Sequence, residues 1–275
     1  MGVDVDADHA HQFGTNSMRG ERALLGFIDL STARTLLSDA FSVVPDGVSV
    51  ICSRITLPGG VVTPEALVEM LEGSGLEDAA MALSSADPSV ISFACTSGSL
   101  IRGLGYDHTI ARRISAVTGI RGTTTSSAVV EALRALRVRR VTVGTPYVES
   151  VNEAERRFLT DSGFTVTAIE GLGLTVDSEI GRVAAAETLD FGRRLSREGA
   201  EAVFLSCTNL DALTSVDELE AELGIPVVTS NQATIWQALR MSGVDEPLPG
   251  FGRLLTLPLI AKDPVRNSPS PRAGE

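Results

Sequence analysis

The chain has 275 residues, of which 43% are hydrophobic and 21% charged, and its mean hydropathy is +0.17. A formal net charge of −12 argues against nucleic acid or an anionic membrane as a partner, because Lys and Arg drive phosphate binding. No apolar stretch approaches the ~20 residues that span a bilayer, and residues 1–20 lack the apolar core of a signal peptide, so we expect a cytoplasmic protein. The polar composition of residues 1–20 and 263–275 predicts disordered tails.

Strand-like and helix-like segments alternate between these tails, which predicts an α/β fold with parallel sheets. Strands are expected at Ala23–Ile28, Val48–Ile55 and Ser89–Ala94. Helices are expected at Ala33–Phe41, Ala66–Glu72 and, with glycine interruptions, Leu100–Val117. Thr63 and Pro64 are residues typical of a helix start.

A second cycle of the same kind begins at the strand-like segment 140–147. A helix at Val151–Ser162, a strand at Phe164–Ile169, a helix near Ser178–Arg197 and a strand at Ala202–Ser206 follow. The spacing from Ser31 to Cys95 matches that from Thr145 to Cys207 to within two positions, so the cycles resemble copies. We therefore predict two lobes, one formed by 21–122 with 229–262 and the other by 123–228.

Two similar motifs end the third strand of each cycle: Phe93–Gly98 and Leu205–Asn209, each with a cysteine followed by threonine. Backbone N–H groups in a turn that opens a helix bind anions and lower the pKa of a thiol. Open α/β sheets bind ligands at the carboxyl ends of their strands, so Cys95 and Cys207 are expected to face one another across a cleft. Cys52 lies within an apolar run and is predicted to be a core thiol, and Trp236 is expected in the core.

A thiolate acts as nucleophile or base and an opposing thiol donates a proton, so this pair suits racemisation or cis–trans isomerisation without metal or cofactor. Three cysteines without CxxC spacing argue against a disulfide framework or zinc site. A Cys–His pair using His108 is the alternative. Donors for a small carboxylate or dicarboxylate substrate are expected around the cysteines, with helix capping as their alternative role, or packing in the case of the tyrosine. These candidates are Ser31, Thr32, Thr96, Ser97, Gly98, Thr145, Tyr147, Thr208 and Asn209.

At these motifs the chain resembles the aspartate/glutamate racemase superfamily, and within it the maleate cis–trans isomerases and their ectoine-utilisation relatives. The resemblance implies two flavodoxin-like lobes related by pseudo-twofold symmetry, a cofactor-independent site between them, and a homo-oligomer. It implies that Cys95 adds to an alkene carbon and that Cys207 protonates its neighbour. Tyr147 and the hydroxyl donors would hold the carboxylates.

Two positions depart from the maleate isomerase pattern. Ala33 stands where those enzymes place a substrate-binding asparagine, and Asp177 falls near a second one. Arylmalonate decarboxylases resemble the same branch but keep only the second cysteine, so Cys95 counts against decarboxylation. The leading interpretation is an isomerase most like maleate isomerase. The alternatives are a racemase acting on aspartate, glutamate or a hydantoin, a decarboxylase, and a carboxylate-binding protein without activity.

Overall fold

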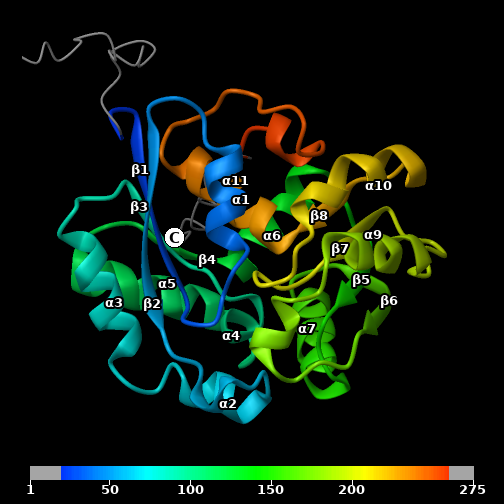
Figure 1. Ribbon diagram of the computed structural model, residues 1–275, viewed down its shortest axis with the longest axis horizontal. Helices are drawn as coiled ribbons and strands as arrows, with labels where there is room; N and C mark the ends of the chain where they lie inside the picture. Colours follow the sequence, from blue (N-terminus) through cyan, green and yellow to red (C-terminus); the bar gives the residue numbers. More distant parts are fainter. Residues whose placement is uncertain (1–19, 260–275) are drawn as a thin grey trace, which may run out of the picture.

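Two four-stranded parallel sheets with the same strand order organise the computed structural model, which describes residues 20–259 (Figure 1). The first sheet has the order β2-β1-β3-β4 and the second β6-β5-β7-β8. The predicted α/β class with two parallel-sheet lobes is thereby confirmed. The strands are β1 (Ala23–Leu30), β2 (Val48–Ile55), β3 (Val90–Phe93), β4 (Gly122–Thr124), β5 (Arg140–Thr145), β6 (Thr165–Gly171), β7 (Ala202–Leu205) and β8 (Val227–Thr229).

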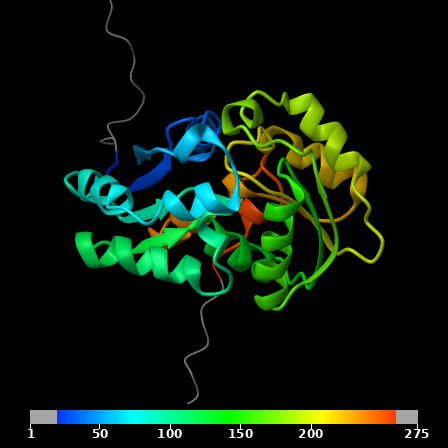
Figure 2. The same ribbon diagram turned by 90° about the horizontal axis from the view of Figure 1, so that it is seen from below.

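Helices connect these strands and cover the sheets (Figures 1 and 2). They are α1 (Leu36–Val43), α2 (Pro64–Glu69), α3 (Gly75–Ser84), α4 (Thr96–Leu100), α5 (Tyr106–Thr118), α6 (Thr125–Ala135), α7 (Glu149–Asp161), α8 (Asp177–Ile180), α9 (Ala185–Arg194), α10 (Val216–Leu223) and α11 (Ser230–Met241). Short 3-10 turns lie at Pro58–Gly60, Leu213–Ser215 and Leu254–Thr256. As predicted, Thr63 caps α2, where its hydroxyl accepts the Ala66 N–H.

Two expected helices were wrong in extent. The segment from Leu100 to Val117 divides into α4 and α5, because Gly103 and Gly105 between them have φ of +82° and +85°, outside the helical region. The segment from Ser178 to Arg197 divides into α8 and α9. The sequence prediction also missed α3, whose buried Leu76, Ala79, Ala80 and Leu83 have the spacing of one helix face.

The placement of Cys52 was also wrong, since this thiol is only half-buried. Its strand, β2, lies at the edge of the first sheet, and its burial pattern is intermediate along most of its length. An edge strand has a neighbour on one side only, so an apolar sequence does not by itself place a residue in the core.

The last helix, α11, lies at the junction of the two sheets (Figure 1). It follows β8 of the second sheet, yet it packs against α1, β1 and β3 of the first and against α6. Trp236 on this helix is fully buried, as predicted, and its indole N–H donates to the Leu257 carbonyl at 2.8 Å. The chain therefore passes back from the second sheet to the first after residue 229, and the lobe boundaries themselves stay a prediction.

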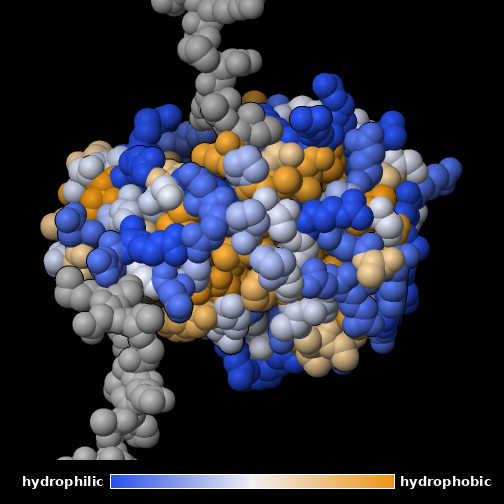
Figure 3. All heavy atoms as spheres, turned by 90° about the horizontal axis from the view of Figure 1, so that it is seen from above, coloured by the Kyte–Doolittle hydropathy of each residue, from blue (hydrophilic) through white to orange (hydrophobic). Residues whose placement is uncertain are grey.

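The surface of the described residues is mixed. Hydrophobic residues reach the face shown in Figure 3 in patches bounded by hydrophilic ones. Within residues 20–259 no helix is both long and apolar enough to cross a bilayer. Both predicted tails fall almost entirely outside the described residues.

Candidate active site

Cys95 lies where β3 ends and α4 begins. It is the N-cap of α4, and its Sγ accepts the Gly98 N–H at 3.3 Å, while the Ser97 Oγ lies 3.9 Å from the same sulfur. A side chain at Gly98 would not fit, because a Cβ there would lie 3.0 Å from the Cys95 Sγ and 2.9 Å from Met70 Cε. The absence of a Cβ therefore allows this N–H to approach the thiol.

Cys207 lies at the equivalent end of β7, but its backbone differs. Its φ of +101° is in the left-handed region that side chains rarely adopt, and such strain is frequent at functional sites. The Cys207 Sγ accepts the Asn209 N–H at 3.3 Å, and its own N–H donates to the Ser230 Oγ at 3.0 Å. The phenol of Tyr147, which follows β5, forms a side-chain hydrogen bond with the Cys207 thiol.

Buried hydrogen bonds join the two cysteine turns. The Thr96 hydroxyl donates to the Ser230 Oγ at 2.8 Å, so one serine links the turn after β3 to the turn after β7. In the other direction, the Thr208 hydroxyl donates to the Ala94 carbonyl at 3.1 Å. The structure therefore brings Cys95, Thr96, Cys207 and Thr208 together at one junction.

Burial sets the electrostatics of both thiols. It raises the pKa of Cys95 to about 12, against the smaller opposing effect of the Gly98 N–H. It raises the pKa of Cys207 further, with repulsion from Asp177 as the second cause and the Tyr147 hydrogen bond opposing it. Repulsion from the Cys95 thiolate is a further, smaller cause of the raised pKa of Cys207.

Two of the predicted substrate donors have another partner. The Thr32 hydroxyl donates to Asp177 Oδ2, and the Asn209 amide donates to the same oxygen at 3.0 Å and to the Asp177 carbonyl at 2.8 Å. The Asn209 Oδ1 accepts the Arg34 N–H at 2.9 Å. Asp177 is 2% exposed, and burial raises its pKa.

The other predicted donors divide by environment. Ser31 is exposed at the end of β1, whereas Ser97 and Tyr147 are buried beside the thiols. The Thr145 hydroxyl donates to Asn152 and accepts the Tyr147 N–H at 3.1 Å, so it shapes the loop that carries Tyr147. His108, the alternative base, lines a separate cavity to which neither cysteine contributes.

Two buried acids near the thiols were not foreseen. Asp29 is 1% exposed at the end of β1, and burial raises its pKa to about 7. Glu155 on α7 is fully buried, and burial raises its pKa to about 7 as well. Within the described chain neither Glu155 oxygen has a hydrogen bond of normal geometry, and the Ser206 hydroxyl that interacts with it is likewise unsatisfied. In the sequence, Glu155 is one of several charged residues on a polar helix, so only the buried face of α7 reveals it.

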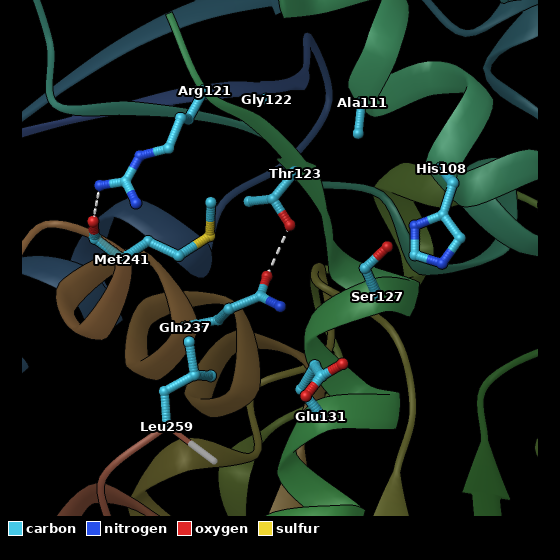
Figure 4. Close-up of a pocket in the computed structure, with 10 residues that line it drawn as sticks. All are labelled: His108, Ala111, Arg121, Gly122, Thr123, Ser127, Glu131, Gln237, Met241 and Leu259. Atoms are coloured by element: carbon cyan, nitrogen blue, oxygen red, sulfur yellow. Dashed lines mark hydrogen bonds between the residues drawn. The ribbon is translucent and has the colours of Figure 1, made fainter. Parts of the chain in front are cut away.

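A cavity of about 370 Å³ lies away from these residues, between α5, β4, α6 and α11 (Figure 4). The Thr123 hydroxyl donates to Gln237 Oε1 at 2.6 Å on its wall, while Arg121 donates to the Met241 carbonyl. His108, Ser127 and Glu131 line the opposite side. None of the predicted site residues lines this cavity.

The family model for arylmalonate decarboxylase matches residues 40–255. Arylmalonate decarboxylase of Bordetella bronchiseptica is 34% identical over 233 residues, which cover 84% of this chain and 95% of the relative. The chain belongs to the arylmalonate decarboxylase family. The chain is also similar to maleate isomerases. The maleate isomerase of Nocardia farcinica is 29% identical over 200 residues, which cover 70% of this chain and 79% of the relative.

Solved structures show the same fold. A serine mutant of the Nocardia farcinica maleate cis–trans isomerase, with a covalently bound succinylcysteine intermediate, superposes with a TM-score of 0.79 at 24% identity. The match covers 85% of this chain and 98% of that one. The predicted superfamily and the maleate isomerase branch with its decarboxylase relatives are confirmed.

Proposed function

We propose that this family member is a cofactor-independent isomerase of a small unsaturated carboxylic acid that uses Cys95 and Cys207, with maleate cis–trans isomerisation as the nearest known reaction. The observation that carries the proposal is the pair of buried thiols at equivalent strand ends, whose turns are joined by hydrogen bonds through Ser230. A decarboxylase that protonates its product from one side needs only one of the two thiols.

The reaction follows from the different partners of the thiols. Cys95 loses its proton to solvent, and its thiolate, held by the Gly98 N–H, adds to one alkene carbon. The displaced π electrons form a carbanion on the neighbouring carbon, stabilised by its carboxylate, and Cys207 transfers its proton there. After rotation about the new single bond, Cys207 removes a proton and the Cys95 sulfur leaves as thiolate. The succinylcysteine in the Nocardia farcinica enzyme is the product that such an addition to maleate gives.

Arylmalonate-type decarboxylation is the second candidate, and the family match together with the 34% identical relative favours it. In this reaction the substrate loses CO2, the electron pair of the broken bond stays on the α-carbon, and Cys207 protonates that carbon. Cys95 would then have no covalent role.

Proton NMR in D2O with maleate, aspartate, glutamate, a hydantoin and a phenylmalonate tests the proposal. We expect a cis alkene acid to become trans, with deuterium exchange at the alkene carbon that Cys207 protonates. Loss of CO2 from phenylmalonate without alkene isomerisation would replace the proposal with the decarboxylase. Deuterium entering an amino acid or hydantoin α-position alone would replace it with a racemase.

A further inference from the structure

Asp177 takes up the hydrogen-bond donors that a dicarboxylate would need. The Thr32 hydroxyl and the Asn209 amide both donate to its Oδ2. Thr32 follows β1 of the first sheet and Asn209 follows β7 of the second, so the two donors come from different sheets. Two donors in this part of the site are therefore replaced by one acidic acceptor.

The contacts place Asp177 beside the reacting groups. Asn209, which binds Asp177 through its amide, also donates its backbone N–H to the Cys207 sulfur. Asp177 is buried, and its charge acts on both Cys207 and Cys95.

The charged groups around Asp177 do not compensate its negative charge. Asp29 is a second acid that interacts with it, and Arg54 directs its guanidinium to the Leu30 and Ala33 carbonyls at 2.6 and 2.8 Å. At position 33 the alanine side chain supplies no donor. A substrate carboxylate at this end of the site would meet like charge without a compensating donor, a strongly unfavourable arrangement when buried.

We propose that Asp177, fixed by Thr32 and Asn209, is a specificity-determining residue that selects a substrate with an N–H donor, a carboxamide or an ammonium group, in place of a second carboxylate. The proposal rests on the proposed function and narrows its substrate class. An asparagine at this position would donate its amide N–H to a substrate carboxylate, whereas an aspartate accepts an N–H from the substrate.

Kinetics with paired substrates test the inference. Turnover of maleate and of maleamate, its monoamide, is compared between the wild-type protein and Asp177→Asn, while D- and L-aspartate serve only as ammonium compounds in a binding assay. We expect kcat/KM of the wild type to favour maleamate over maleate at least tenfold. Asp177→Asn is expected to shift that ratio toward maleate by about a hundredfold. Asp39→Asn, which changes another buried acid that binds Asn231, is the control and should leave the ratio unchanged.

Protection of Cys95 and Cys207 from alkylation by each compound separates this inference from the proposed function, because it reads binding without turnover. Stronger protection by maleamate or aspartate than by maleate supports the inference even if no compound is converted. Preference of the wild type for maleate, or an unchanged ratio in Asp177→Asn, overturns it. The wild-type preference alone decides the question if the variant does not fold.

Discussion

The turns after β3 and β7 each carry a cysteine at the equivalent position of two sheets with the same strand order. The backbone conformation and the surroundings of the two cysteines differ. Cys95 has extended backbone, with φ of −147°, and caps a helix. Cys207 has φ of +101° and leads into an irregular turn, and the Tyr147 phenol forms a hydrogen bond with its thiol. The repeat places two thiols together, and the local turn distinguishes them.

This difference assigns the roles within the proposed function. The Cys95 sulfur accepts a helix N–H, which favours the thiolate and hence the nucleophile. Burial and repulsion from Asp177 raise the pKa of Cys207, which keeps its proton in place for transfer to carbon. Substitution of one cysteine at a time is therefore expected to block the reaction at two different steps.

The largest expected effect comes from serine at each cysteine. Cys95→Ser should lose turnover by roughly a thousandfold or more and form no adduct, because an alcohol is a far weaker nucleophile at neutral pH. Cys207→Ser should lose turnover similarly but accumulate a covalent adduct of protein and substrate. Intact-protein mass spectrometry distinguishes the two, and Cys52→Ser is the matched control. Near-native activity in both variants would refute the two-thiol mechanism.

A second comparison concerns two buried acids, Asp39 on α1 and Glu155 on α7. Asp39 receives an amide hydrogen bond from Asn231 at 2.7 Å, whereas Glu155 has the unsatisfied Ser206 as its neighbour. Burial raises the pKa of both to about 7. An acid whose pKa is raised in the folded protein does not affect stability at a pH below its pKa in the unfolded chain. It destabilises the folded protein once the pH exceeds that unfolded pKa.

Glu155→Gln should therefore remove part of the pH dependence of stability. For wild type, the Glu155 contribution should lower the free energy of unfolding by about 3 kcal/mol between pH 4.5 and 7 and stay constant above. The variant lacks this loss, so the gap between the two proteins should widen over that range. Urea unfolding at pH 5 and 8 measures it. Glu153→Gln, an exposed change on the same helix, is the control. An equal change of unfolding free energy with pH in wild type and Glu155→Gln would contradict the burial argument.

The smallest effect concerns the strained backbone of Cys207. Cys207→Gly should be more stable than Cys207→Ala by about 1 kcal/mol, because glycine adopts a positive φ without the Cβ penalty. At Cys95, where φ is −147°, the order should reverse, with alanine the more stable. Thermal unfolding of the four variants tests the comparison. The same order at both sites would show that backbone strain does not distinguish them.

Three strands of each sheet and both cysteines could be predicted because they depend on local pattern: apolar runs of strand length, the motifs that end them, and their repeat. The short strands β4 and β8 were not foreseen. The helix α3 was equally visible in the spacing from Leu76 to Leu83, and was missed. The pairing of Thr32 with Asp177 could not be read in this way, since the two residues are far apart in sequence and meet only when the lobes join. The burial of Glu155 likewise depends on which face of α7 meets the second sheet.

Trp236 is a natural fluorescent probe of the junction between the two lobes. It is the chain's single tryptophan, it is fully buried, and its helix touches elements of both sheets. Its emission spectrum therefore comes from one known position, without overlapping signals from other indoles. A red shift during denaturation would report water reaching the junction between the lobes, and a collisional quencher would measure how often that junction opens in the folded state.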